Sequence, residues 1–167
     1  MPSADRDVPR GALSPCGGGG VDPVAPARDA LERVLTYFSN AAPRHTEDEE
    51  RSLFPRMRGS GDPDAGAALA AIDVLEADHE RAAAMHEEVD RLCRNWLRFG
   101  FLEASRAEQL RARIAELTTL YASHIRTEEQ LVFTAAARAL DGGLLLEIGR
   151  EMARRRGLAW DPAPTAP

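Results

Sequence analysis

Cysteine is nearly absent from this sequence of 167 residues, which contains only Cys16 and Cys93. Two cysteines cannot form the disulfide framework of a small secreted protein, and neither belongs to a Cys-x-x-Cys pair of the kind that binds zinc or exchanges disulfides. Because disulfides are typical of oxidising compartments, their absence favours a reduced environment. We therefore expect a cytoplasmic protein.

Long apolar runs and an excess of positive charge are also missing. No segment approaches the roughly 20 apolar residues that a membrane span requires, and the N-terminus lacks the apolar core of a signal peptide. The net charge of −6 argues against nucleic acid or an anionic membrane as the main partner. The one dense basic run, Arg154 to Arg156, falls where a last helical turn should end, so we interpret it as complementing the helix dipole rather than as an anion-binding patch.

Aromatic residues make up only 5% of the sequence, whereas hydrophobic residues, many of them Ala and Leu, make up 44%. This composition favours helices over a sheet. Apolar periodicity and helix-stop residues predict three long helices and one short one, over residues 26–56, 64–97, 103–140 and 144–156. Pro43 should kink the first helix, and Pro55 should contribute to ending it. The predicted fold is all-α, an up-and-down helical bundle in one domain of residues 25–156.

Both ends of the chain lack this periodicity. Residues 1–24 contain four prolines and five glycines, including the run Gly17 to Gly20, and are predicted to be disordered. Residues 157–167 are rich in proline and are predicted to form a flexible tail.

One motif, His-x-x-x-Glu-Glu-x-x-x-Phe, occurs twice in a chain with only four histidines, starting at His45 and at His124. Residues four apart on an α-helix lie on one face, so His45 and Glu49 point in one direction, and so do His124 and Glu128. A buried carboxylate costs several kcal/mol unless it is paired or binds a cation. Two such helices facing each other would therefore assemble a metal site from two histidines and two glutamates.

Both copies of the motif continue apolar stripes, which is why we expect these polar residues to face the core. The inward positions of the two stripes include, besides the motif residues, Leu35, Phe38, Ile114, Leu117, Leu131 and Ala135.

The other two histidines, His79 and His86, lie on the apolar stripe of the predicted middle helix. They are two turns apart, roughly 10 Å along the helix axis, so they cannot both reach a compact site with equal ease. His79 is the stronger candidate, because it lies nearer the middle of the helix and follows the acidic residues Glu76 and Asp78. A single histidine on an apolar helix face, such as His86, more often packs in the core than binds a metal. We nevertheless keep His86 as a candidate ligand.

The ligand types favour iron. Mixed imidazole and carboxylate ligands suit iron, manganese and zinc, and the lack of clustered cysteines disfavours a structural zinc site. Ferritin-like bundles also build di-iron sites from inward side chains, but with repeated Glu-x-x-His motifs. The segment from Glu76 to His79 is the single match to that motif.

Residues 45–55, 75–79 and 124–133 resemble, in order and spacing, the motifs of the hemerythrin-like, HHE cation-binding family, and the resemblance covers about residues 26–156. It implies a four-helix bundle around a non-haem di-iron centre. In that centre Glu49 and Glu128 would bridge the two ions, and the terminal ligands would be His45, His79 and His124. The family normally begins with a helix that carries a further histidine, and residues 1–24 contain none. It also has a second histidine on the third helix, four residues after the first, where this chain has Ala83.

Three functions follow from these observations. The first is a di-iron protein that binds or senses dioxygen, nitric oxide, another small diatomic ligand or iron itself, without necessarily being an enzyme. The second is an oxidase or peroxide-consuming enzyme that uses the same ligands, with Tyr121 as the only obvious inward proton donor. The third is a metal-free helical interaction domain whose site has decayed. We expect the first.

Overall fold

The computed structural model describes residues 25–160, almost all of which are helical. The elements are α1 (Ala25–Asp48), η1 (Glu49–Leu53), α2 (Phe54–Gly59), η2 (Pro63–Ala65), α3 (Gly66–Phe99), α4 (Ala104–Thr127), η3 (Glu128–Val132), α5 (Phe133–Ala139) and α6 (Gly142–Arg155). The predicted all-α bundle is confirmed, and the described residues form no strand. The predictions made for residues 1–24 and 161–167 lie outside the described residues.

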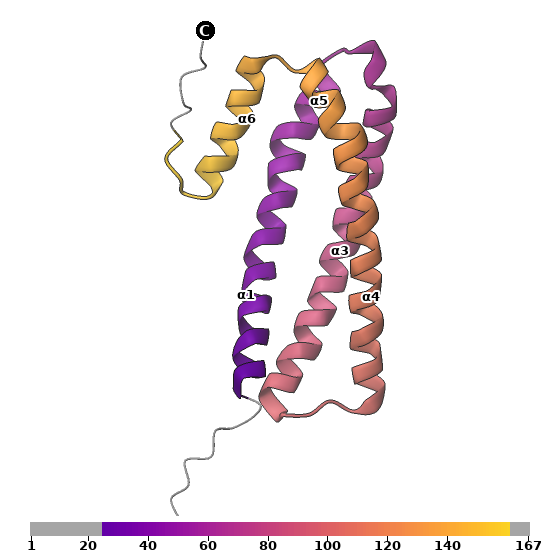
Figure 1. The fold of residues 1–167 in the computed structure, drawn as a ribbon, viewed down its shortest axis with the longest axis vertical. Coiled ribbons are helices and arrows are strands. Elements are labelled where there is room, and N and C mark those ends of the chain that lie inside the picture. The colour runs from indigo at the N-terminus through magenta and orange to yellow at the C-terminus, as the bar shows by residue number, and fades with distance from the viewer. Residues whose placement is uncertain (1–24, 161–167) are drawn as a thin grey trace, which may run out of the picture.

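The helices α1, α3 and α4 follow the long axis of the molecule, with α3 antiparallel to the other two (Figure 1). The most extensive packing is between α3 and α4, and α1 contacts both α3 and α6. The short helix α6 lies beside one half of α1. None of the helices described is long and apolar enough to cross a membrane.

Two of the long predicted helices contain an interruption that we did not predict. Each includes a five-residue π-helical segment, η1 or η3, which begins at the first glutamate of the repeated motif, Glu49 or Glu128. A π-helix uses i→i+5 hydrogen bonds, so one extra residue enters the turn, and such segments occur frequently at functional sites. The extra residue rotates the faces that follow: Val132 is completely buried, whereas Leu131, which we predicted to face inward, is 42% exposed.

The two prolines of the first helical run do not end it. Pro43 lies inside α1, which continues to Asp48. Pro55 was expected to help end the helix, but it lies in the first turn of α2, which continues to Gly59. A proline is tolerated there because the first turn of a helix does not need its backbone N–H.

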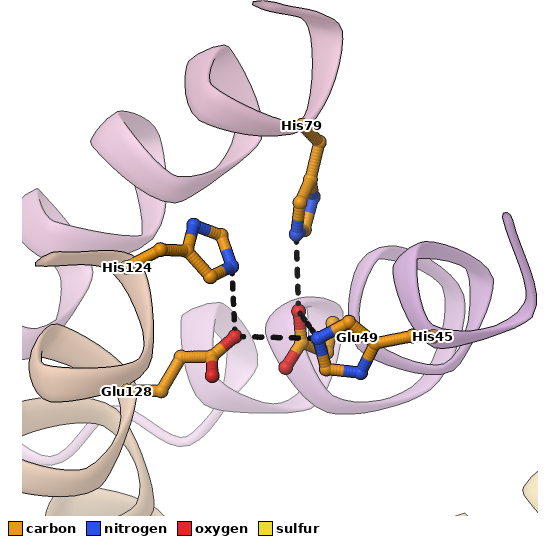
Figure 2. Close-up of side chains that lie close together, drawn as sticks. All are labelled: His45, Glu49, His79, His124 and Glu128. Carbon is orange, nitrogen blue, oxygen red and sulfur yellow. Dashed lines mark ion pairs between the residues drawn. The ribbon is translucent and has the colours of Figure 1, made fainter. Parts of the chain in front are cut away.

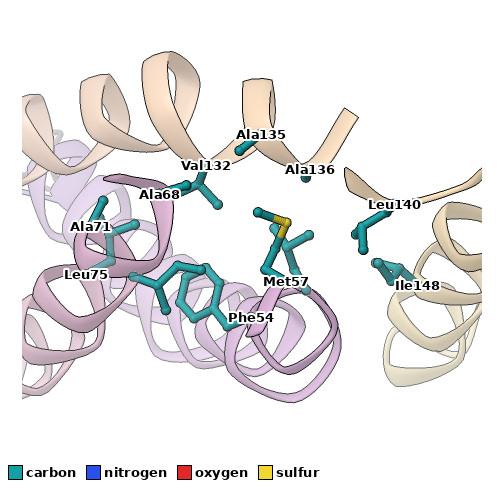
Figure 3. Close-up of a cluster of buried hydrophobic side chains, with 12 residues drawn as sticks. Phe54, Met57, Ala68, Ala71, Leu75, Val132, Ala135, Ala136, Leu140 and Ile148 are labelled. Atoms are coloured by element: carbon teal, nitrogen blue, oxygen red, sulfur yellow. The ribbon is translucent and has the colours of Figure 1, made fainter. Parts of the chain in front are cut away.

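The main hydrophobic core lies where α2, α3, α5 and α6 meet (Figure 3). Its completely buried side chains are Phe54, Met57, Ile72, Leu75 and Val132. Burial of each such side chain stabilises the fold by about 1.5–3 kcal/mol. A smaller cluster between α3 and α4 contains Ala82, Met85, Leu117 and Leu120. Along α3, His79 lies between residues of the two clusters, and His124 and Glu128 do so along α4 and η3.

Some positions that we predicted to face inward are exposed. Phe38 of α1 is 41% exposed and Ile114 of α4 is 48% exposed. Among the described helices, α6 does not reach the part of the bundle that contains Phe38 and Ile114, so only α1, α3 and α4 run there (Figure 1). Three helices cover fewer apolar positions than four. The periodic stripes therefore placed the motif residues on the facing sides of their helices, but the predictions that Phe38 and Ile114 face inward were wrong.

Helix α6 is attached to the first helical run partly through Glu151. Arg56 Nη2 donates a hydrogen bond to Glu151 Oε1 at 2.8 Å, and Ser52 Oγ donates to Glu151 Oε2 at 2.6 Å. The hydrogen bond from Arg56, followed by that from Ser52, lowers the pKa of Glu151 from 4.5 to about 2.

This lowered pKa predicts a pH-dependent stability. Because the pKa is lower in the folded state, the ionised Glu151 stabilises the fold above about pH 4.5, and this contribution is lost as the pH falls through about 2. We expect the free energy of unfolding, measured with urea, to decrease across this range, and to decrease less in Glu151→Gln. Equal pH dependence in the two proteins would contradict the prediction.

Candidate metal centre

Five of the six predicted metal-binding residues converge at one point (Figure 2). They come from three different helical runs and are His45, Glu49, His79, His124 and Glu128. One potential ligand atom from each lies within 4.8 Å of those of all the others. Four of the five are buried, whereas the side chain of His45 is 48% exposed. The cluster thus has a buried interior and one side open to solvent.

The two glutamates occupy the centre of the cluster. Glu49 Oε2 lies 3.2 Å from His79 Nε2 and 3.7 Å from His45 Nε2. Glu128 Oε1 lies 2.9 Å from His124 Nε2 and 3.6 Å from His45 Nε2. Each carboxylate therefore faces one buried histidine, and both face the exposed His45.

Several buried polar atoms of the cluster lack a well-aligned hydrogen-bond partner among the described residues. They include Glu49 Oε2, Glu128 Oε1, His79 Nε2 and His124 Nε2, all of which point into the cluster. An unsatisfied buried polar group costs about 1–3 kcal/mol. A cation between these atoms would satisfy them together, and imidazole with carboxylate is a ligand set that iron, manganese and zinc accept. The residues present therefore fit a metal ion.

The two glutamates have pKa values shifted in opposite directions. Burial raises the pKa of Glu49, and the nearby Glu128 adds to this effect, while His79 opposes it. Burial alone would also raise the pKa of Glu128, but its contacts with His124 and His45 outweigh burial and lower it. The pair thus contains one carboxylate that is readily ionised and one that takes up a proton more easily.

His45 and His79 both hold a proton more tightly than usual. The contact with Glu128 raises the pKa of His45. Burial lowers the pKa of His79, but its contacts with Glu49 and Glu50 outweigh this effect and raise it overall. Because a histidine binds a metal only through a deprotonated nitrogen, we infer that metal binding here would release protons.

Two acidic residues lie behind the buried histidines. Glu50 Oε1 is 2.9 Å from His79 Nδ1, and Asp78 Oδ2 is 3.8 Å from His124 Nδ1. A carboxylate that accepts a hydrogen bond from one ring nitrogen directs the other nitrogen toward a metal. Glu50 is placed to do this for His79. Our sequence reasoning did not single out Asp78 in this way; the only signal was its position directly before His79.

His86, the sixth candidate, lies outside the cluster. Its Nε2 is 2.8 Å from the hydroxyl of Tyr121, and the ring of Phe38 stacks on it at a centroid distance of 5.3 Å. Burial lowers its pKa. The Tyr121 ring lies 6.4 Å from that of His124, so one residue separates His86 from the cluster.

This placement predicts different effects for the two histidines of α3. His79→Ala removes a buried nitrogen that points into the cluster, so we expect it to lower the metal content of the purified protein strongly. His86→Ala removes a side chain bonded to Tyr121, so we expect the metal content to stay at the wild-type level. Elemental analysis of both variants provides the measurement. Equal losses would show that His86 belongs to the ligand set.

The arrangement of long antiparallel helices around buried histidines and carboxylates is that of a metal-binding helical bundle. The family model of the hemerythrin HHE cation-binding domain matches residues 11–136, so the chain belongs to this family. The matched region begins before α1 and ends before α6. The recognition of this family from the repeated motif is confirmed.

The chain is also similar to an uncharacterized protein of Haemophilus influenzae. The two are 33% identical over 131 residues, which is 75% of this chain and 67% of that protein. No solved structure shows significant similarity to the chain.

Proposed function

We propose that this protein holds a non-haem di-iron centre and uses it to bind or sense a small ligand, such as dioxygen, nitric oxide or iron itself. Glu49 and Glu128 would bridge the two ions, and the terminal ligands would be His45, His79 and His124. The observation that supports this most directly is the convergence on one point of buried carboxylate and imidazole atoms that lack well-aligned hydrogen-bond partners among the described residues. Membership in a cation-binding family supports it independently.

The surroundings of the cluster suit a small ligand. His79, His124 and the two glutamates are buried, and the ring of Phe54 stacks almost parallel to that of His79, with centroids 6.3 Å apart. These groups keep water away from the interior of the site, while the side at His45 remains open. Bound iron would supply the redox chemistry and an open coordination position, and the protein would supply orientation and exclusion of water. We also propose a cytoplasmic location, as the sparse cysteines suggest.

Tyr121 gives an enzyme some support as the second candidate. Its hydroxyl is 2.8 Å from His86 Nε2, and its ring lies beside His124, so a phenol is available near the cluster. An oxidase or peroxide-consuming enzyme would need such a donor of protons. A metal-free interaction domain is less favoured, because it would leave the buried atoms of the cluster unsatisfied.

The test is the metal content and the visible spectrum of protein purified from iron-supplemented cells. We expect about two irons per chain, as in other di-iron bundles, and an absorbance that changes reversibly when oxygen is removed and returned. Consumption of peroxide without such a reversible change would favour the enzyme. A folded, helical chain without metal would contradict the di-iron proposal.

A further inference from the structure

Helix α6 is bound to the start of η1 by buried polar contacts. Arg155 Nη1 donates a hydrogen bond to Asp48 Oδ1 at 2.7 Å, and Arg155 Nη2 donates to Ser52 Oγ at 2.5 Å. Arg156 forms a second ion pair with Asp48. Asp48 and Ser52 are 3% and 0% exposed, and the Arg155 side chain is 19% exposed, so the contacts of Arg155 are largely shielded from water, whereas Arg156 reaches the surface. One guanidinium therefore joins two buried residues that lie one turn apart.

These contacts revise our interpretation of the basic run. We read Arg154 to Arg156 as residues that complement a helix dipole. Arg154 is exposed, as that interpretation expects, but Arg155 and Arg156 bind a specific buried carboxylate on another helix. Arg155 and Arg156 therefore connect α6 to α1 through Asp48, in addition to any effect on the dipole of α6.

The bound carboxylate adjoins a residue of the candidate metal centre. Asp48 is the last residue of α1, and Glu49 is the first residue of η1. Asp48 and Glu49 share a peptide bond, so contacts that hold the backbone at Asp48 restrict the direction in which the Glu49 side chain leaves the backbone. Arg155 also contacts Ser52, which lies inside η1. Because a π-helical turn is rarely stable by itself, contacts from outside help to maintain it.

We infer that Arg155 is a positioning residue for the metal centre: through Asp48 and Ser52 it holds η1 in the conformation that directs Glu49 toward His79. Metal occupancy and the docking of α6 are then coupled. This inference rests on the proposed function, because it assigns Glu49 to the metal. Helix α6 begins after residue 136, where the family match ends, so the coupling is built from a part of the chain outside the matched domain.

A set of single variants tests this role. Arg155→Ala removes the contacts with Asp48 and Ser52. Ile148→Ala weakens the docking of α6 through its buried apolar side chain, 5% exposed, and keeps Arg155. Arg154→Ala removes a positive charge from the exposed neighbour. The affinity of each protein for Fe²⁺ alone is measured without oxygen, by competition with a chelator.

We expect Arg155→Ala to weaken Fe²⁺ binding about 10- to 100-fold, the range typical for partners behind metal ligands. Ile148→Ala should weaken Fe²⁺ binding much less than Arg155→Ala does, because it loosens α6 but keeps the contacts of Arg155 with Asp48 and Ser52. Arg154→Ala should bind Fe²⁺ as the wild type does. Unchanged affinity in Arg155→Ala, or an equal loss in Ile148→Ala, would overturn the inference. If Arg155→Ala does not fold, Asp48→Asn removes the ion pairs with Arg155 and Arg156 with little change of volume and should show at least the same loss. Unchanged affinity in that variant would likewise overturn the inference.

A second measurement separates positioning from general stabilisation. Coupling between two sites is reciprocal, so Fe²⁺ binding should slow amide hydrogen exchange across residues 142–155 in the wild type. In Arg155→Ala, saturating Fe²⁺ should leave the exchange of α6 unchanged. Iron binding to the wild type without protection of α6 would overturn the inference and leave the proposed function intact. A wild-type chain that binds no iron would overturn both.

Discussion

Replacement of Glu49 and Glu128 together by glutamine is expected to reduce the iron content of the purified protein to less than about one tenth of the wild-type value. A neutral amide cannot neutralise or bridge two cations as a carboxylate does. Both side chains are buried at the centre of the cluster, and each faces one buried histidine. The neighbouring carboxylates of Glu50 and Asp78 lie near the Nδ1 atoms of His79 and His124, whereas Glu49 and Glu128 face the Nε2 atoms. Elemental analysis after purification from iron-supplemented cells measures the effect.

The loss of iron should occur without loss of the fold. The two glutamates belong to neither hydrophobic cluster, and each has a buried oxygen atom without a well-aligned partner among the described residues. Glutamine keeps the shape and removes the charge, so we expect the helical circular dichroism signal to be retained. Glu129→Gln is the matched control, because Glu129 is the exposed neighbour of Glu128 in η3. Iron retained by the double variant, or lost equally by the control, would contradict the assignment.

The part of the site that could be predicted from the sequence depends on local spacing. His45 with Glu49 and His124 with Glu128 were predicted to face one point because residues four apart share a helix face. The structure brings these residues together. His79 was preferred over His86 by its position along the helix, and the structure places it in the cluster, with His86 bonded to Tyr121.

Two features of the site have no local signal. The π-helical turns at Glu49 and Glu128 insert a residue, and a regular periodic stripe contains no mark of such an insertion. The prediction for Leu131 was wrong for this reason, since the face that it would have occupied belongs to Val132. The contact between Arg155 and Asp48 spans 107 positions of sequence. A contact of that range depends on how α6 folds back, which periodicity does not describe.

The two copies of the motif are alike in sequence but not in their surroundings, and the last residue of each shows this most clearly. Phe54 and Phe133 occupy equivalent positions, five residues after Glu49 and Glu128. Phe54 is completely buried in the main core, whereas Phe133 is 43% exposed. Sequence symmetry alone would assign the two rings the same role, and burial separates them.

Phe54→Ala is therefore expected to lower the free energy of unfolding by about 3–5 kcal/mol, the usual range for removing a phenylalanine from a core. Phe133→Ala should change it by less than about 1 kcal/mol, because half-exposed side chains lose little burial. Urea unfolding of the metal-free proteins measures both. Phe54 also packs against the ring of His79, so its loss should leave that ring less well held and weaken iron binding. Equal destabilisation by the two substitutions would contradict the prediction.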